Sequence, residues 1–408
     1  DKVATLLAAG APVNREKLAQ IAKDAKLKTK KKIDEAAEAG LVLAAREIVG
    51  RGDTLEKTYD NLVALYNDQP NLSAKTSTSK IAQAYSTPAP LAFVASQLAE
   101  IEQYQGVTVA EWTAGNGMLL IEADPKSVQA NEMDPVRAQT LRDQGFEVSE
   151  EDATKWEPKE ESGHVIINPP FGTVVTKEQT KKKFPFVGDE TTTQIDHSIA
   201  IRALENMLPD GRAVLILGGV KATDPDARRK AYDTGDKARF YGHIYQNYKV
   251  IDHFTVDGDL YKKQGAGWPV DVVVIDSKGQ APTDLPSQIP PRIISTWVDL
   301  GTELEKTDEQ RIDERRATEG EVRDALGGAF GEGAGDAAQD IGPDGERVDL
   351  PDAEQPAGRR PRKQTGESAR PGEGADTGEA GPGAGGKGVS DVASGGKRGD
   401  GDRAPAKP

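Results

Sequence analysis

The centre of the chain holds an apolar run that ends in an asparagine and two prolines, Val165-Ile166-Ile167-Asn168-Pro169-Pro170-Phe171. Each proline ring fixes φ and the first also restricts the residue before it, so Asn168 at the end of the predicted strand has little backbone freedom. The Asn168 amide and the Pro169 carbonyl can accept hydrogen bonds from an NH2 group, and Phe171 offers a flat face to a planar ring. The segment therefore predicts a site for a planar amine, with a plain Pro-Pro turn as the alternative.

A second segment, residues 107–120, predicts a strand that runs into a turn of small residues and then into a helix. Gly115 and Gly117 in this turn would let a ligand approach the backbone closely. The segment contains neither the six-residue dinucleotide fingerprint nor the lysine and hydroxyl of a phosphate-binding loop. It therefore predicts a ligand site of another kind.

Two more strand-like runs, residues 127–135 and 146–156, end in acidic residues, Glu132 and Asp152. Taken singly, each acid is more often a solvated loop carboxylate than a ligand contact. Taken in order with the glycine turn and Asn168, they fall at the ends of successive strands of one alternating β/α pattern. Open sheets bind ligands at these strand ends.

This order of motifs resembles the S-adenosylmethionine-dependent amino-methyltransferases that modify the N6 amine of adenine in DNA. The resemblance implies an α/β, Rossmann-like class I methyltransferase fold, with a mostly parallel sheet closed by an antiparallel hairpin. It implies that the glycine turn binds the methionine end of the cofactor, Glu132 the ribose and Asp152 the adenine amine, with Met133 packed on the adenine. The implied cofactor-binding residues are Tyr85, Thr87, Pro88, Glu111, Ala114, Gly115, Gly117, Met118, Glu132, Met133, Asp152 and Ala153, and the implied catalytic residues are Asn168, Pro169, Pro170 and Phe171.

The family also has an upstream cofactor motif of the type aromatic-x-Thr-Pro, which Tyr85-Ser86-Thr87-Pro88 matches. We expect Thr87 to cap the following helix and Pro88 to occupy its first position. Any capped helix would look the same, so this motif only supports the others.

A narrower resemblance covers about residues 55–300 and is most evident in residues 65–92. It is to the methyltransferase module of very large phage and plasmid proteins that also carry a strawberry-notch-like helicase, the group that includes the defence-against-restriction protein B. The resemblance implies a module of a longer polypeptide, with DNA and a fused or associated helicase as partners and an antirestriction or DNA-modification role.

Composition limits the possible chemistry of the chain. It has 408 residues, of which 5% are aromatic, and no cysteine. The absence of cysteine removes disulfides, thiolate metal sites and the covalent mechanism of the cytosine C5-methyltransferases, and we expect no metal. No long apolar run and no leader is visible, so we expect no membrane contact and a cytoplasmic location in a bacterial host, with packaging in a phage virion as a further possibility.

Composition also divides the chain into regions. We expect a helical region at 1–78, in which residues 15–32 and 33–49 are helices, and the methyltransferase domain at 79–302. A short helix at 303–328 and a disordered acidic Gly/Pro-rich tail at 329–408 follow, because the tail cannot bury enough apolar surface to offset its ordering entropy.

The formal net charge of −15 opposes a nucleic-acid substrate, because phosphate contacts dominate nucleic-acid affinity. Two local basic stretches, residues 177–186 and 221–241, favour such a substrate, because both are predicted near the strand ends where a nucleic-acid backbone would lie. The candidates for contacts with a nucleic-acid backbone are Lys181, Lys182, Arg228 and Arg229.

The predicted reaction is direct methyl transfer to an adenine that is flipped out of the duplex and stacked on Phe171. His197 follows the tetrad and is a possible acid or base, although a surface or structural role is the commoner one. One alternative is methylation of a glutamine amide in a protein, or of an amine in RNA or at cytosine N4, since each presents a planar NH2. A second is a non-catalytic component of a virus-like particle.

Overall fold

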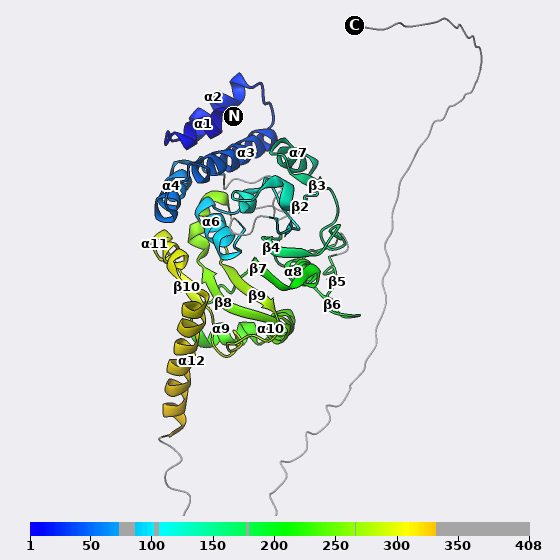
Figure 1. Cartoon of the computed structure of the whole chain (residues 1–408), viewed down its shortest axis with the longest axis vertical. Coiled ribbons are helices and arrows are strands. Elements are labelled where there is room, and N and C mark those ends of the chain that lie inside the picture. The colour runs from blue at the N-terminus through cyan, green and yellow to red at the C-terminus, as the bar shows by residue number, and fades with distance from the viewer. Residues whose placement is uncertain (73–85, 102–105, 177–178, 266, 332–408) are drawn as a thin grey trace, which may run out of the picture. The chain divides into compact units, whose positions relative to one another are not determined.

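The chain folds around a mixed sheet whose strands lie in the order β3-β2-β1-β4-β7-β9-β8-β10 (Figure 1). The computed structural model describes residues 1–72, 86–101, 106–176, 179–265 and 267–331, with side chains up to residue 320. Tyr85 and most of the predicted tail, residues 332–408, lie outside the described residues. The strands are β1 Val109–Glu111, β2 Val128–Asn131, β3 Glu147–Ser149, β4 Ser162–Ile167, β7 Met207–Gly218, β8 Tyr248–Val256, β9 Val270–Lys278 and β10 Arg292–Ile294.

Strand direction is mostly parallel. The run β3-β2-β1-β4-β7 is parallel throughout, and β10 is parallel to β8. Strand β9 lies between β7 and β8 and is antiparallel to both, so the expected antiparallel hairpin that closes the sheet is confirmed and consists of β8 and β9. The fold is the Rossmann-like class I methyltransferase type that the motif order implied.

Both faces of the sheet are buried, which explains the continuous apolar runs of the central strands. Alternate residues of one strand point to opposite faces, so Ile166 packs into one core cluster and Val165 and Ile167 into the other. The first cluster joins the sheet to the N-terminal helices and to α6 (Ala89–Leu98), and the second joins it to α8 (Ile195–Asn206) and α10 (Gly235–Asn247).

The remaining helices surround this framework. At the N-terminal end, α3 lies beside α7 (Figure 1). A small hairpin of β5 (Phe184–Pro185) and β6 (Thr191–Thr192) follows the segment from Asn168 to Phe171. The other elements are α1 Lys2–Ala8, α2 Arg15–Asp24, α3 Lys30–Val49, α4 Leu55–Asp68, η1 Met118–Leu120, η2 Pro125–Ser127, α7 Pro135–Asp143, α9 Pro225–Tyr232, η3 Gly258–Gln264, α11 Trp297–Gly301, η4 Thr302–Glu305 and α12 Asp308–Gly331.

The N-terminal helices differ from the expectation at one point. The predicted helix over residues 15–32 is broken, because α2 ends at Asp24 and Lys26 adopts a left-handed backbone conformation with φ of 56°. Thr29 then caps α3 by accepting a hydrogen bond from the Lys32 backbone N–H. The basic run Lys28 to Lys32 therefore forms a helix start rather than a continuous helical face.

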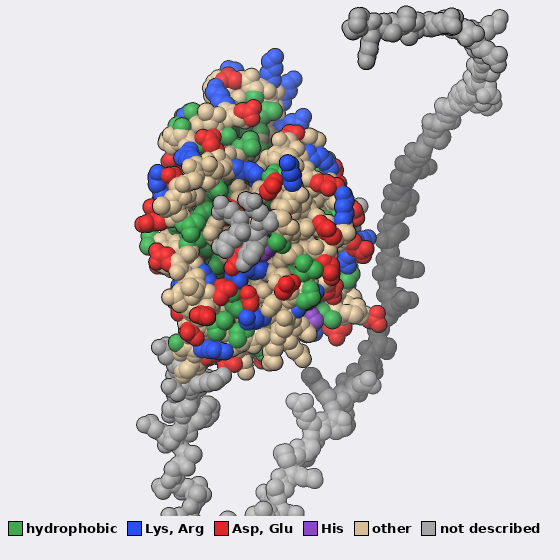
Figure 2. All heavy atoms as spheres, in the orientation of Figure 1, with side chains coloured by type: hydrophobic (Ala, Val, Ile, Leu, Met, Phe, Trp, Pro, Cys, Tyr) green, Lys and Arg blue, Asp and Glu red, His purple; other side chains and the backbone are tan. Residues whose placement is uncertain are grey.

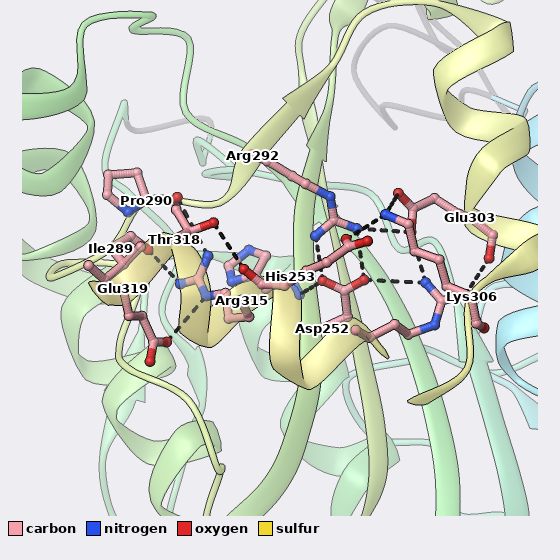
Figure 3. A network of polar contacts seen from close by, with 12 residues as sticks. Asp252, His253, Ile289, Pro290, Arg292, Glu303, Lys306, Arg315, Thr318 and Glu319 are labelled. Atoms are coloured by element: carbon pink, nitrogen blue, oxygen red, sulfur yellow. Dashed lines mark hydrogen bonds and ion pairs between the residues drawn. The ribbon is translucent and has the colours of Figure 1, made fainter. Parts of the chain in front are cut away.

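A buried ion network fastens α12 to the sheet (Figure 3). Asp252 of β8 accepts hydrogen bonds from Arg292 of β10 at 2.7 and 2.9 Å, and Glu303 accepts from Arg292 at 2.9 Å and from Arg311 of α12 at 2.8 Å. Burial alone would raise the pKa of Asp252, but Arg292 and Arg311 lower it below its ordinary value. The helix expected at 303–328 is thus part of the folded unit from Asp308 onward.

Replacing Asp252 by alanine tests this network. The substitution removes one of the two carboxylates that neutralise Arg292 and Arg311, so we expect the free energy of unfolding to fall by about 3–5 kcal/mol. Chemical denaturation measures the change. In the control, Asp259→Ala removes an exposed pair with Lys262 and should cost less than about 1 kcal/mol. Equal losses in both variants would contradict the assignment.

Candidate functional site

A cavity of about 420 Å³ lies at the carboxyl ends of β1, β2, β3 and β4. Parallel strands bring these ends to one edge of the sheet, which gathers residues from four separate segments. Residues predicted for the site that line it are Thr87, Glu111, Ala114, Gly115, Met118, Glu132, Met133, Asp152, Ala153, Asn168 and Pro170. Pro88, Gly117, Pro169 and Phe171 are outside its lining.

The glycine turn has the backbone conformation that glycine favours. Gly115 has φ of 57° and Gly117 φ of 94°. A Cβ on Gly117 would come within 2.9 Å of a Leu141 methyl group, so the Leu141 side chain would have to shift to admit it. The turn leads into the helix expected from the sequence, which is the short 3-10 helix η1.

Glu132 joins the end of β2 to this turn. One of its carboxylate oxygens accepts from the Gly115 backbone N–H at 2.8 Å, and the other accepts from the Asp134 N–H at 2.7 Å. Burial raises the pKa of Glu132, although these hydrogen bonds oppose the rise. Each oxygen keeps a second lone pair for a ligand hydroxyl.

Glu111, at the end of β1, presents an unpaired acceptor to the same cavity. Its Oε1 accepts from the Thr113 N–H at 3.0 Å, whereas its buried Oε2 has no hydrogen-bond partner among the described residues. Burial raises the pKa of Glu111 to about 8. A buried acceptor without a partner is costly, so this oxygen is suited to a donor on a bound ligand.

Asp152 contributes a third carboxylate. The Thr154 N–H and hydroxyl donate to its Oδ1 at 3.0 and 2.7 Å, and in the described part of the chain no donor contacts Oδ2. Burial tends to raise the pKa of Asp152, but the two Thr154 hydrogen bonds contribute to a net lowering. Asp152 is therefore an ionised acceptor with one free oxygen at the cavity wall.

Helix α3 supplies a wall of the cavity that the sequence did not predict. Glu35 accepts from Arg137 of α7 at 2.9 Å, and Glu38 accepts from the same guanidinium at 3.3 Å. Both acids are buried and line the cavity. The available signal was their i, i+3 spacing among small apolar residues, which places two acids on the buried face of one helix.

Asn168 is oriented by Thr87, at the start of α6. Its Nδ2 donates to the Thr87 hydroxyl at 2.8 Å, whereas its buried Oδ1 has no partner among the described residues. The buried Tyr261 hydroxyl lies beside this amide without forming a hydrogen bond of good geometry. Thr87 is not the helix cap that we expected, because Pro88 occupies the N-cap position and α6 begins at Ala89.

The basic candidates lie in different environments. Lys181 lines an open surface groove with Lys230 and Lys237. The Lys182 ammonium lies 4.8 Å from the centre of the Phe184 ring. On the face drawn in Figure 2, acidic and basic side chains are interspersed.

The two arginine candidates are engaged within the protein. Arg228 is 5% exposed and donates to the Thr255 hydroxyl at 2.9 Å, which leaves it inside the fold rather than on a surface that a nucleic-acid backbone can reach. Arg229 pairs with Asp226 on the same helix. Arg228 is thus a structural residue, because it fills a buried polar position beneath α9.

His197 has a structural environment. It is 1% exposed and stacked on Phe240 with ring centroids 4.2 Å apart. Burial lowers the pKa of His197 to about 4, so the imidazole is neutral at pH 7. The sequence reading that favoured a structural histidine agrees with this position.

Among the described residues, no helix has both the length and the apolar character needed to cross a membrane. The same residues contain no group of three or more His, Asp or Glu side chains arranged to hold a metal ion.

Comparison with known proteins gives distant similarities of fold. No family model matches the sequence, and no curated protein matches it. A putative class I S-adenosylmethionine-dependent methyltransferase from Listeria monocytogenes is 13% identical, with a TM-score of 0.46, over 76% of this chain and 99% of that one. A modification subunit of a putative type I restriction enzyme from Vibrio vulnificus is 14% identical, with a TM-score of 0.37, over 56% and 51% of the two chains. The M protein of the type I restriction enzyme EcoKI is also 14% identical, with a TM-score of 0.37, over 68% and 65%. At these sequence identities and TM-scores, the similarity does not extend to the reaction.

Replacing Glu111 by glutamine tests the buried carboxylate. The pKa of Glu111 is about 8 in the folded chain, whereas an exposed glutamate has a pKa of about 4.3. Between these values the folded state binds more protons than the unfolded state, so the free energy of unfolding of the wild type falls as pH rises from about 5 to 8. Glu111→Gln should remove this contribution, which is at most about 1.4 kcal/mol per pH unit.

Urea denaturation at several pH values between 5 and 8 measures the effect. The advantage of Glu111→Gln over the wild type should grow with pH and level off above pH 8. The control Glu157→Gln changes a side chain that is 86% exposed and should leave the slope unchanged. Parallel stability curves for wild type and Glu111→Gln would refute the assignment.

Proposed function

We propose that the chain is an S-adenosylmethionine-dependent methyltransferase that methylates the N6 amine of adenine in DNA. The observation that carries the proposal is the Asn168 amide at the end of β4, which lines the same cavity as three carboxylates from the ends of β1, β2 and β3. The cavity thus combines a rigid acceptor for a planar amine with acceptors for a cationic nucleoside.

The residues of the cavity fit the proposed cofactor. The unpaired Oε2 of Glu111 suits the ammonium of a methionine moiety, and the second lone pairs of Glu132 suit ribose hydroxyls. The free oxygen of Asp152 suits the adenine amine, and Met133 is 67% exposed and able to cover an adenine ring. When bound, S-adenosylmethionine supplies a methyl group on a positively charged sulfur.

The catalytic turn acts by positioning and by hydrogen bonding. The unpaired Oδ1 of Asn168 and the Pro169 carbonyl accept from the substrate NH2, which directs the nitrogen lone pair away from the ring plane. Phe171 provides the face against which the base stacks. In the proposed transfer the nitrogen lone pair would form the new N–C bond as the S–C bond of the cofactor breaks, the sulfur would leave as a neutral thioether, and the surplus proton would pass to solvent. His197 takes no part, because it is buried and stacked on Phe240.

We infer the wider role from the resemblance over residues 55–300. A methyltransferase module next to a helicase suits an antirestriction or DNA-modification role in a bacterial cell infected by a phage or carrying a plasmid. DNA is then the partner, and Lys181 and Lys182 remain candidates for contacts with its backbone, since both are exposed.

A second candidate function is methylation of a glutamine amide in a protein. The net charge of −15 and the burial of Arg228 favour it, because both weaken attraction to a phosphate backbone. A glutamine amide presents the same planar NH2 to Asn168.

Asn168→Ala removes the acceptor that grips the substrate amine. We expect kcat for methyl transfer to fall by a factor of about 10²–10³, since that contact is made mainly in the transition state. Calorimetric titration with S-adenosylmethionine should give an affinity close to that of the wild type. The control Asn247→Ala alters an amide at the end of α10 that donates to the His243 carbonyl, and should retain full activity.

Transfer of a tritiated methyl group identifies the acceptor. The three acceptors are adenine-containing DNA, the same DNA with a purine lacking the 6-amine in place of adenine, and whole-cell protein. Counts on the first alone support adenine N6. Equal counts on the two DNA samples contradict it, and counts on protein alone favour the glutamine reaction.

A further inference from the structure

A buried carboxylate outside the cavity lining joins the catalytic turn to the end of β7. Asp196 lies in the first turn of α8 and is 2% exposed. Its Oδ1 accepts from the Gly172 backbone N–H at 3.2 Å, and its Oδ2 accepts from the Gly218 N–H at 3.2 Å. Gly172 directly follows Phe171, and Gly218 is the last residue of β7.

Gly172 and Gly218 pack closely around Phe171 and Asp196. A Cβ on Gly218 would lie 3.0 Å from the Cβ of Phe171 and 3.5 Å from Oδ2 of Asp196. Gly172 has φ of 89°, and its carbonyl accepts from the Ile195 N–H at 3.0 Å. Both backbone polar groups of Gly172 are therefore bound to the start of α8, which leaves the residue carrying the aromatic ring little freedom.

The carboxylate serves other segments rather than its own helix. A helix-capping residue accepts from the free N–H groups of the first turn, but Asp196 accepts its hydrogen bonds from Gly172 and Gly218 in other segments. The N-cap position of α8 is held by Gln194, which forms no side-chain cap. Stabilisation of α8 therefore does not by itself explain a buried acid at this position.

The electrostatic setting favours an acid at this position, because the N-terminal turn of α8 carries partial positive charge. Lys237 lies on the far side of Gly218 and donates to its carbonyl at 2.5 Å. Gly218 is thus held through its N–H by an acid and through its carbonyl by a lysine.

We propose that Asp196 is a positioning residue for methyl transfer: it holds Gly172 and Gly218 so that the Phe171 ring lies in the plane on which the acceptor base stacks. The proposal rests on the proposed function, since it assigns Asp196 a role in placing that function's substrate. Asp196 touches neither substrate nor cofactor and acts through Phe171.

Asp196→Asn tests the role with little change of shape. An amide can accept from one glycine N–H, but its NH2 group then faces the other N–H, so one of the two contacts is lost. We expect kcat/KM for the DNA acceptor to fall by about tenfold or more, and S-adenosylmethionine affinity by calorimetry to stay within about twofold.

A double-mutant cycle separates positioning from general stability. If Asp196 acts through Phe171, the Asp196→Asn substitution should have almost no further effect on kcat/KM in a Phe171→Ala background. Fluorescence of 2-aminopurine at the target position, which reports stacking of the base, should change alike in both single variants. Additive losses in kcat/KM, or unchanged fluorescence in Asp196→Asn, would overturn the proposal.

Asp236→Asn is the matched control. Asp236 lies in the first turn of α10 and accepts from the Thr193 N–H at 2.8 Å and from its hydroxyl at 2.7 Å, so it also fixes a loop to a helix start. It should lose stability to urea as Asp196→Asn does, but keep kcat/KM near the wild-type value. Equal losses of kcat/KM in the two variants would show a structural role only.

The outcomes for Asp196 and for the proposed function are distinguishable. If the wild type methylates protein rather than DNA, the substrate assignment fails, and the same cycle is measured on the protein acceptor. If the wild type methylates DNA and Asp196→Asn behaves like Asp236→Asn, only the role of Asp196 fails. Absence of transfer to any acceptor overturns both.

Discussion

One carboxylate connects the elements on which the site depends. Glu132 directly follows β2, and its two oxygens hold the backbone of the glycine turn after β1 and the start of α7. Without those two hydrogen bonds, the backbone of Gly115 and the start of α7 would lose the contacts that join them to the end of β2. The strands β1 and β2 are only three and four residues long, so their own ladder supplies little rigidity. At the carboxyl ends of these strands, side-chain to backbone hydrogen bonds therefore supply the rigidity that strand pairing supplies inside the sheet.

Charge in the cavity is balanced unequally, and the imbalance favours a ligand that carries positive charge. Arg137 neutralises part of the negative charge of Glu35 and Glu38, whereas among the described residues Glu111 pairs with no cation and keeps one oxygen unpaired. A raised pKa near 8 is the cost of that arrangement to the empty protein. A ligand that brings positive charge relieves this cost on binding, whereas a phosphate group would increase it. The same reasoning explains why the turn lacks the lysine of a phosphate-binding loop.

The sequence predicted the parts of the site that depend on local rules. The order of strands and turns followed from apolar runs and glycines, and Asn168 followed from the restriction that two prolines impose. The sequence did not predict Thr87 as the partner of Asn168, because that contact joins segments 81 residues apart. The charge of Arg228 led us to predict a surface position, but its side chain is buried and donates to the Thr255 hydroxyl. Asp196 was missed for the same reason, because its contacts with Gly172 and Gly218 join segments 24 and 22 residues apart.

Strand β9 lies between β7 and β8 in the sheet, although it is synthesised after both of them. Strand β7 ends at Gly218, but its neighbour on that side is β9, which begins at Val270, and β8 pairs with β9 rather than with β7. During synthesis on the ribosome, β7 emerges with an open apolar edge and remains so until β9 has left the exit tunnel. Helices α9 and α10 are made in this interval, and their tyrosines later cover Asp271 at the start of β9. The central strands thus close late, and an unpaired strand edge is the feature of a nascent chain most exposed to wrong pairing.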